Sequence, residues 1–240
     1  MLTNENAAGR RSAHFQESRA APAALLFLQG RSEKTEYRIF DLRQATDEAL
    51  SHWYAQASPE KRQRLDRLRR PEDRKRSLCA DHLARTMLGE LSGLPPQSLR
   101  FDRLPTGKPI VIGLPYHFNV THSGHFAACA VDTAPVGIDL ETPRSFREAL
   151  AKRVCCPAEE AFLYPNGHFD ERRFLELWTV KEAFMKYTGT GLSCDWKQLC
   201  AVRDGVLAVP GLALLHLCTS EYTLSVLYEK PLDFPAEAVV

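Results

Sequence analysis

Changes in the spacing of apolar residues divide the chain into segments with a helical period and segments with a strand period. After Pro71, apolar residues from Leu78 to Leu91 recur near one helical face until Gly93, which predicts a long helix. Over 137–141, apolar and acidic residues alternate, which predicts a strand. Helices are predicted at 46–57, from 59 onward, at 71–93, 146–154 and 170–187, and strands at 24–28, 36–40, 99–103, 118–121, 126–131, 137–140, 198–202, 212–218 and 222–228. This mixture predicts an α+β fold of one or two domains.

The composition narrows the class of protein. With 240 residues, of which 44% are hydrophobic and 25% charged, the chain is typical of a soluble globular protein with a large core. A net charge of +1 argues against overall attraction to nucleic acid or a membrane, and no apolar run is long enough to span a bilayer. Seven cysteines without a C-x-x-C pair or zinc spacing predict reduced thiols and a cytoplasmic location.

The N-terminus superficially resembles a signal peptide, because Arg10, Arg11 and Arg19 precede an apolar run over 20–28. Pro22 interrupts that short run, and no small-residue cleavage site follows it. Residues 1–22 are therefore predicted to be a disordered extension.

Two segments carry the residues of a candidate metal site. Asp139 and Glu141 alternate along the predicted strand and therefore project from one of its faces. Glu182 and Lys186 are four residues apart and share one face of the predicted helix 170–187. If these side chains converge, three carboxylates and a lysine form a divalent-cation site beside a phosphate-binding group, and the hard oxygen ligands favour Mg²⁺.

Each pair also has a simpler interpretation. Glu182 and Lys186 have the spacing of an exposed ion pair on a helix surface, although apolar neighbours such as Leu177 predict a helix sunk into the protein. Asp139 and Glu141 are equally compatible with the polar face of an edge strand. The spacing alone leaves both alternatives open.

Basic residues are dense over 61–76, and such a run is most often a solvated helix face. A nucleic-acid surface is disfavoured by the balanced net charge and by the absence of interleaved aromatic residues. Further along the chain, Gly107-Lys108-Pro109 predicts a turn, and 118–124 predicts a strand that ends in a tight turn with His122.

Taken in order, these segments resemble the signature of the 4′-phosphopantetheinyl transferases, of the Sfp type that activates surfactin synthetase. Both family motifs, G-[IV]-D-[IVL]-E and W-x-x-K-E-[AS]-x-x-K, are present without departure at 137–141 and 178–186. The segments 58–62, 107–109 and 118–124 match as well, and the resemblance extends from about residue 36 to about residue 228.

The resemblance implies two similar α/β lobes related by a pseudo-twofold axis, each with a small antiparallel sheet and packed helices. It places the N-terminal lobe at 23–135, the C-terminal lobe with the signature helix at 136–232, and a tail at 233–240. The active site is expected in the cleft between the lobes.

The resemblance also implies the reaction. The enzyme would transfer the 4′-phosphopantetheine moiety of coenzyme A to a serine hydroxyl of an acyl- or peptidyl-carrier protein, releasing adenosine 3′,5′-bisphosphate. Mg²⁺, or alternatively Mn²⁺, would be held by Asp139, Glu141 and Glu182. Glu182 would accept the serine proton, directly or through water, and Lys186 would offset developing negative charge. The contacts expected with coenzyme A are Lys61, Arg64, Arg76, Lys108, Pro109, Thr121, His122 and Lys186.

Two departures and two alternatives accompany this interpretation. Thr121 stands where many relatives have serine, which keeps the hydroxyl, whereas Cys155 and Cys156 stand where relatives often have aromatic residues, so carrier preference stays open. A metal-dependent phosphohydrolase, or a non-catalytic protein that binds coenzyme A or a carrier, would use the same residues. We expect a cytoplasmic monomer with neither nucleic acid nor a membrane as its partner.

Overall fold

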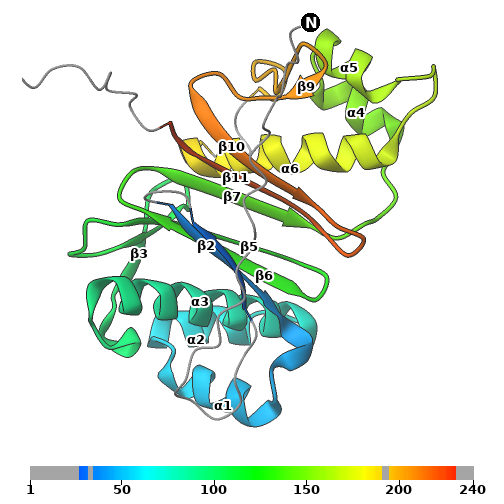
Figure 1. Ribbon diagram of the computed structural model, residues 1–240. Helices are drawn as coiled ribbons and strands as arrows, with labels where there is room; N and C mark the ends of the chain where they lie inside the picture. Colours follow the sequence, from blue (N-terminus) through cyan, green and yellow to red (C-terminus); the bar gives the residue numbers. More distant parts are fainter. Residues whose placement is uncertain (1–26, 32–34, 191–194, 231–240) are drawn as a thin grey trace, which may run out of the picture.

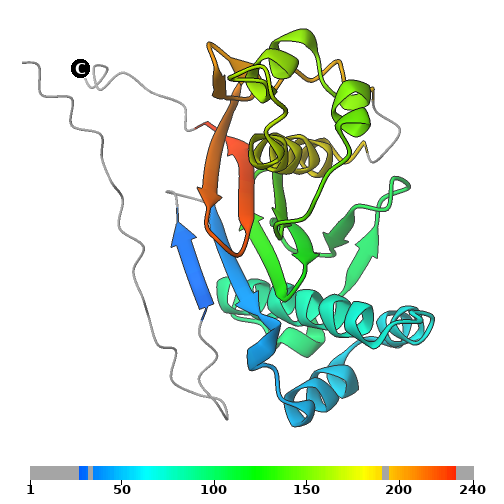
Figure 2. The same ribbon diagram turned by 90° about the vertical axis from the view of Figure 1, so that its right-hand side faces the viewer.

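The computed structural model describes residues 27–31, 35–190 and 195–230 (Figure 1). The predicted extension 1–22 and the predicted tail 233–240 lie outside these residues. Figures 1 and 2 show four layers, in which two antiparallel sheets lie against each other and helices cover their outer faces. The predicted α+β class with two similar lobes is confirmed, while the residue boundaries assigned to the lobes stay a prediction.

The N-terminal half builds a four-stranded antiparallel sheet in the order β1-β2-β6-β5, with three helices over one face. Its strands are β1 (Phe27–Arg31), β2 (Glu36–Asp41), β5 (His117–Ser123) and β6 (Phe126–Asp132), and its helices are α1 (Asp47–Gln56), α2 (Pro59–Asp66) and α3 (Pro71–Ser92). The smaller elements are two 3-10 helices, Leu42–Gln44 and Pro96–Ser98, and a hairpin of β3 (Phe101–Arg103) and β4 (Pro109–Val111). Buried residues of α3, among them Leu83 and Met87, join this sheet in one apolar core.

Local capping explains where these helices begin and end. Thr46 Oγ1 accepts a hydrogen bond from Ala49 N at 3.1 Å, and Ser58 Oγ accepts one from Lys61 N at 3.2 Å. The long helix α3 stops at Gly93, whose φ of +72° lies in the left-handed region that glycine adopts without strain. These three boundaries agree with the sequence prediction.

The C-terminal half builds a three-stranded antiparallel sheet in the order β10-β11-β7, with α6 packed on its outer face (Figure 1). Its strands are β7 (Val136–Glu141), β10 (Leu212–Cys218) and β11 (Thr223–Glu229), and its helices are α4 (Glu148–Val154), α5 (Pro157–Leu163) and α6 (Glu171–Thr188). Asp170 caps α6 as predicted, since its Oδ1 accepts from Arg172 N at 3.0 Å and Arg173 N at 3.1 Å.

One predicted strand of this half is wrong over most of its length. Within 198–202, only the last residue enters a strand, the short β8 (Val202–Arg203), which pairs with β9 (Val206–Leu207). Leu199 O and Ala201 N bond to buried side chains of α6 and α5, and of these two residues only Ala201 O accepts a backbone hydrogen bond within the described chain, from Ala208 N at 3.0 Å. The apolar pattern of this segment therefore reflects burial beside two helices.

The two sheets pack face to face and bury a shared apolar layer. On the N-terminal side it includes Tyr37, Ile39 and Ala128, and on the C-terminal side it includes Ile138 and Leu224. Side chains alternate between the two faces of β7. Its apolar residues therefore enter this layer, and its acidic residues point to the opposite face of the strand. The two lobes are therefore held together by this shared apolar layer as well as by the continuous chain.

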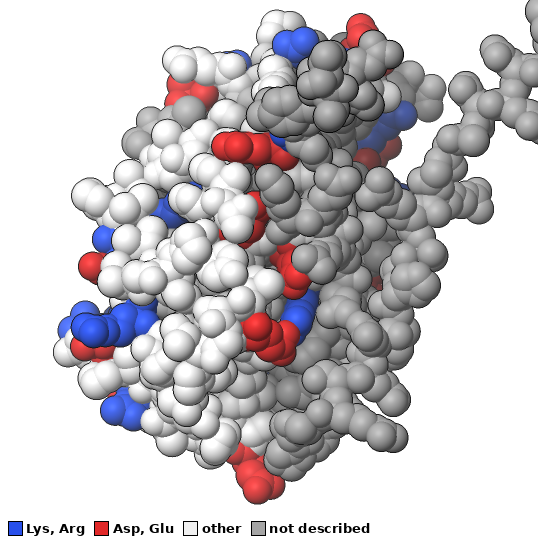
Figure 3. Space-filling view, turned by 60° about the vertical axis from the view of Figure 1, so that its left-hand side comes forward, with Lys and Arg blue, Asp and Glu red and all other residues white. Residues whose placement is uncertain are grey.

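The surface is mixed in charge. On the face shown in Figure 3, acidic and basic side chains are interspersed among uncharged ones, and neither sign dominates the described residues. This agrees with the net charge of +1. None of the helices in the described ranges combines the length and the apolar character needed to cross a bilayer.

Strand β7 approaches α6 very closely at Gly137. A Cβ atom built there would lie 2.0 Å from the carbonyl oxygen of Ala183 and 2.6 Å from the backbone nitrogen of Tyr187. Both contacts are with backbone, so no side-chain rotation relieves them. Glycine is required here because of this contact between strand and helix.

We therefore expect Gly137→Ala to lower the free energy of unfolding by about 3 kcal/mol or more, as overpacking against a rigid backbone does. The measurement is urea unfolding followed by circular dichroism. Gly205→Ala is the control, because its methyl group would meet no atom within 4 Å and tests only the left-handed turn, worth about 1–2 kcal/mol. Equal losses in the two variants would contradict the close-packing explanation.

Candidate functional site

An ion pair at the junction of α6 and β7 is the centre of the candidate site. Lys186 Nζ lies 2.6 Å from Asp139 Oδ1, and the Asp139 side chain is almost fully buried. Thr121 Oγ1, from β5 of the other lobe, donates to the same Oδ1 at 2.9 Å. The second oxygen, Asp139 Oδ2, is buried and has no hydrogen-bond partner among the described residues. An acceptor left in this state is destabilising unless a donor or a cation fills the position.

Glu141 lies two residues along the same strand face. Its Oε2 accepts a hydrogen bond from Ser123 Oγ at 2.7 Å, and its Oε1 pairs with Arg144 at 3.2 Å. Burial raises the pKa of the Glu141 carboxyl, and the charge of Asp139 raises it further, while Ser123 and Arg144 act in the opposite direction. Two hydroxyls of β5 thus hold two carboxylates of β7 across the lobe boundary.

Glu182 completes the acidic group from α6. Burial raises the pKa of its carboxyl to about 7, and the negative charges of Asp139 and Glu141 add to the rise. The charges of Lys186 and Arg144 oppose it. The charges of Asp139 and Glu141 therefore act on Glu182, but the oxygens of the three carboxylates do not form a group in which all lie within 4.8 Å of one another, and a metal site built from all three stays a prediction.

These residues fit a divalent cation. They offer hard carboxylate oxygens on two elements, and Asp139 Oδ2 is a buried oxygen without a donor among the described residues. A cation would also offset the repulsion from Asp139 and Glu141, which adds to burial in raising the pKa of Glu182. The donor set is the kind that Mg²⁺ or Mn²⁺ accepts, with positions left for phosphate oxygens and water.

Positive charge gathers next to the acidic group. His122, at the end of β5, has a lowered pKa, first because of burial and then because of the charges of Lys186, Arg76 and Lys61. Those three cations come from α6, α3 and α2 respectively. Arg76 also donates to Gly124 O at 3.3 Å, which places it over the turn that follows His122. Elements distant in sequence therefore direct cations to one place.

Lys61 lies beneath this basic surface. Its ammonium donates to Ser77 O at 2.8 Å and to Ser77 Oγ at 3.0 Å, with Asp81 at 3.8 Å. Burial lowers the pKa of Lys61 to about 8, and the charges of Arg64 and Arg103, among others, add to this while Asp81 opposes it. Arg64 is exposed, so it extends the same positive region to the surface.

The predicted turn at 107–109 connects β3 and β4 and reaches across to the other lobe. Lys108 Nζ donates to Tyr187 O at 2.7 Å, at the C-terminal end of α6, and Pro109 begins β4. Burial lowers the pKa of the Lys108 ammonium. This turn therefore fixes a cation beside the last turn of the helix that carries Glu182 and Lys186.

Two residues that shape the site, Ser123 and Lys181, were not among those predicted from the sequence. Ser123 shares the strand face of Thr121, and the period-two spacing of β5 contained that signal. Lys181, inside the signature motif, donates to Glu159 Oε2 at 2.7 Å and to two backbone carbonyls, and is completely buried. Its partner lies 22 residues earlier in the chain, and no local pattern indicates that pairing. Lys181 anchors α6 rather than facing a ligand.

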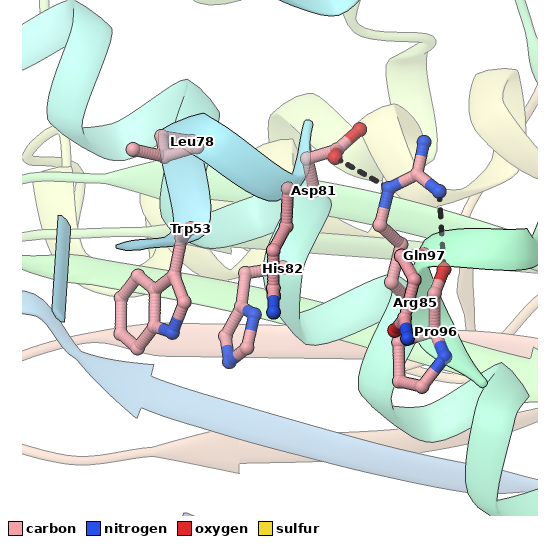
Figure 4. Close-up of a pocket in the computed structure, with 8 residues that line it drawn as sticks. Trp53, Leu78, Asp81, His82, Arg85, Pro96 and Gln97 are labelled. Carbon is pink, nitrogen blue, oxygen red and sulfur yellow. Dashed lines mark hydrogen bonds and ion pairs between the residues drawn. The ribbon is translucent and has the colours of Figure 1, made fainter. Parts of the chain in front are cut away.

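A small cavity in the N-terminal half borders the basic region through Asp81, the partner of Lys61 (Figure 4). Trp53 stacks on His82 with ring centroids 4.0 Å apart, and Asp81 pairs with Arg85 at 2.8 Å. Burial lowers the pKa of His82 to about 4, so the imidazole is neutral at physiological pH. The cavity is a packed junction of α1 and α3 rather than a ligand site.

Comparison with known proteins agrees with this geometry. Residues 135–228 match the family model described as the 4′-phosphopantetheinyl transferase superfamily, and residues 44–134 match the one described as 4′-phosphopantetheinyl transferase, N-terminal. The chain therefore belongs to the 4′-phosphopantetheinyl transferase superfamily and is an enzyme of this class.

Three relatives illustrate the similarity. A 4′-phosphopantetheinyl transferase of Bacillus subtilis is 40% identical over 58% of this chain and 63% of its own length. The 4′-phosphopantetheinyl transferase Sfp of Bacillus subtilis strain 168 is 35% identical over 65% of this chain and 71% of its own length. The 4′-phosphopantetheinyl transferase psf-1 of Bacillus pumilus is 39% identical over 56% of this chain and 58% of its own length.

The raised pKa of Glu182 predicts a pH dependence of metal binding. A cation binds the ionised carboxylate, so affinity rises with pH as Glu182 loses its proton around pH 7. We expect the Kd for Mg²⁺ to fall about tenfold between pH 6 and pH 8, measured by isothermal titration calorimetry. In Glu182→Gln this pH dependence should flatten. Glu171→Gln, at an exposed position on the same helix, should keep the parent behaviour, and a parent Kd independent of pH would refute the prediction.

Proposed function

We propose that this enzyme transfers the 4′-phosphopantetheine moiety of coenzyme A to a serine hydroxyl of an acyl- or peptidyl-carrier protein, converting the apo carrier to the holo form. The observation that carries the proposal is the acidic group of Asp139, Glu141 and Glu182 beside Lys186 at the contact of α6 and β7. The relatives named as 4′-phosphopantetheinyl transferases support it. The second product is adenosine 3′,5′-bisphosphate.

The reaction is the attack of an alcohol on the β-phosphorus of a pyrophosphate, in which charge neutralisation and positioning supply most of the catalysis. Mg²⁺, with Mn²⁺ as an alternative, would be held by Asp139, Glu141 and Glu182 and would supply charge neutralisation at the pyrophosphate. Thr121 and Ser123 orient the two carboxylates of β7.

Glu182 and Lys186 act on the reacting groups. With a pKa of about 7, the Glu182 carboxyl is well placed to accept the serine proton near neutral pH, directly or through a water molecule. Lys186 keeps its ammonium next to the acidic group through Asp139, so it offsets negative charge that develops toward the leaving group. Both residues lie on one face of α6, which fixes their separation.

The remaining contacts bind coenzyme A. Arg64, Arg76 and Lys61 form the positive region that would receive the 3′-phosphate, with Lys61 supporting it from below. His122 lies near Lys186, and Lys108 lies at the C-terminal end of α6; both would contact the phosphates of the nucleotide, with Pro109 next to Lys108. Thr121 contributes through Asp139, because its hydroxyl donates to that carboxylate.

Several further properties belong to the same proposal. We infer a cytoplasmic monomer that acts on coenzyme A and a carrier protein, with neither nucleic acid nor a membrane as a partner. The mixed surface charge supports this, as do the free cysteines of the described chain.

Intact-mass spectrometry of a panel of apo carrier proteins, incubated with the enzyme, Mg²⁺ and coenzyme A, tests the function. We expect a mass gain of one phosphopantetheine on at least one carrier. Asp139→Asn should slow the transfer by about 100-fold or more, because the cation loses a ligand and Lys186 loses its ion-pair partner. Asp47→Asn, at an exposed position on α1, is the matched control. Breakdown of coenzyme A without a carrier, and no carrier modification, would identify a phosphohydrolase instead.

The assignment of the 3′-phosphate is tested with 3′-dephospho-coenzyme A. Each charge-assisted contact contributes about 1.5–3 kcal/mol, so the parent enzyme should show a KM at least roughly tenfold higher for this analogue. Arg76→Ala should raise the KM for coenzyme A and narrow the gap between the two substrates. Arg69→Ala, exposed in the same basic run, should leave the gap unchanged. An unchanged gap in Arg76→Ala would remove Arg76 from the phosphate site.

A further inference from the structure

Cys156 and Cys200 are distant in sequence but adjacent in the C-terminal half. Their sulfur atoms, together with a carboxylate oxygen of Glu159, lie within 4.8 Å of one another. The Cys200 thiol donates a hydrogen bond to Val202 O at 3.6 Å. Within this cluster Cys200 is half-buried, while Cys156 is the more buried of the two thiols and the neighbouring Cys155 is buried. A small reagent therefore reaches the pair through Cys200 and does not reach Cys155.

The thiol pair borders a buried polar network that connects three segments. Glu159 Oε2 accepts from Cys156 N at 2.9 Å and from Lys181 Nζ at 2.7 Å, and its Oε1 accepts from Ala201 N at 2.7 Å. Lys181 also donates to Leu199 O at 2.6 Å. The start of α5, the middle of α6 and the segment before β8 are thus held at one point.

Two thiols and a carboxylate could also bind a metal ion, but the hydrogen bonds and the ion pair of Glu159 disfavour metal binding here. Glu159 already accepts three hydrogen bonds, and its ion pair with Lys181 is buried, with side chains only 0% and 1% exposed. A cation bound to this carboxylate would displace the ammonium of Lys181 and leave a buried charge without a partner. The two thiols remain as the reactive groups.

We propose that Cys156 and Cys200 form a reversible dithiol–disulfide site whose oxidant is a low-molecular-weight disulfide. One cysteine thiolate attacks a sulfur of the oxidant RSSR and releases one RS⁻, giving a mixed disulfide. The second thiolate then attacks the cysteine sulfur of this mixed disulfide and releases another RS⁻. In total, two thiols lose two protons and two electrons, and RSSR becomes two RSH. The inference goes beyond the transfer reaction and does not depend on it.

The disulfide would clamp elements that the structure already holds together. The sulfurs already lie within 4.8 Å of each other, so a bond of about 2 Å requires a movement of at most a few ångströms. Because the bond links positions 156 and 200, it closes a long loop and restricts the unfolded chain. The loop contains α6, whose Lys181 is tied to both ends of the bond through Glu159 and Leu199.

Oxidised glutathione is the probe that tests the site. The full chain carrying Cys194→Ser and Cys218→Ser is incubated with it, alkylated and digested with trypsin. We expect a cross-link between the peptides 154–172 and 198–203, the loss of two hydrogens from the intact mass, and reversal by dithiothreitol. The melting temperature should rise by about 5 °C on oxidation, as expected for a disulfide that closes a long loop.

Matched variants identify the sulfur atoms involved. Cys156→Ser and Cys200→Ser should each abolish the cross-link, whereas Cys155→Ala should retain it, which distinguishes the two neighbouring cysteines within one peptide. Mixed disulfides with glutathione alone, a cross-link that requires Cys155, or no product would overturn the proposal. Binding of one zinc ion per chain that protects both thiols from alkylation would overturn it in favour of a metal site. An unchanged melting temperature of the cross-linked protein would refute the clamping role.

Discussion

The contact between β7 and α6 at Gly137 determines the geometry on which the rest of the site depends. The strand backbone lies so close to the helix backbone that a methyl group would approach Ala183 O to 2.0 Å. At this separation, Asp139 on the strand lies 2.6 Å from Lys186 on the helix. The charges of both residues act on the pKa of Glu182. Helix and strand must approach closely for short carboxylates to converge. Gly137 in the strand motif thus allows the charged residues of the helix motif, Glu182 and Lys186, to approach Asp139.

Strand β7 also serves both lobes at once. Its apolar residues Ile138 and Leu140 enter the layer shared by the two sheets, and its acidic residues face hydroxyls of β5. A strand with period two can do this because alternate side chains point to opposite faces. The apolar side joins the lobes, and the polar side carries the carboxylates that we propose as cation ligands. The six residues of β7 therefore provide both apolar side chains that stabilise the contact between the lobes and acidic side chains of the candidate site.

Sequence reasoning was sufficient where the signal is local or where whole motifs match a family. Asp170 and Gly189 define α6 through capping, and the matched segments identified the superfamily and the α+β fold in two lobes, which the comparisons and the structure confirm. Prediction from sequence failed where a residue's hydrogen-bond partners lie far away in the chain. The strand predicted at 198–202 is mostly absent, because backbone groups there bond to Lys181 and Glu159. Neither residue carries a local sign of that pairing, since tertiary contacts alone decide it.

The contact of Lys108 with the end of α6 has a consequence for ligand binding. A free lysine side chain samples many rotamers, and ordering it costs up to about 2 kcal/mol. Here Nζ is already held on Tyr187 O at 2.7 Å, and an ammonium has three donors, so the others stay available to a phosphate. The side chain is therefore ordered in the absence of ligand. In the proposed reaction, binding of coenzyme A at this position would lose little rotational freedom, and the C-terminal end of the signature helix would form part of a preorganised nucleotide site.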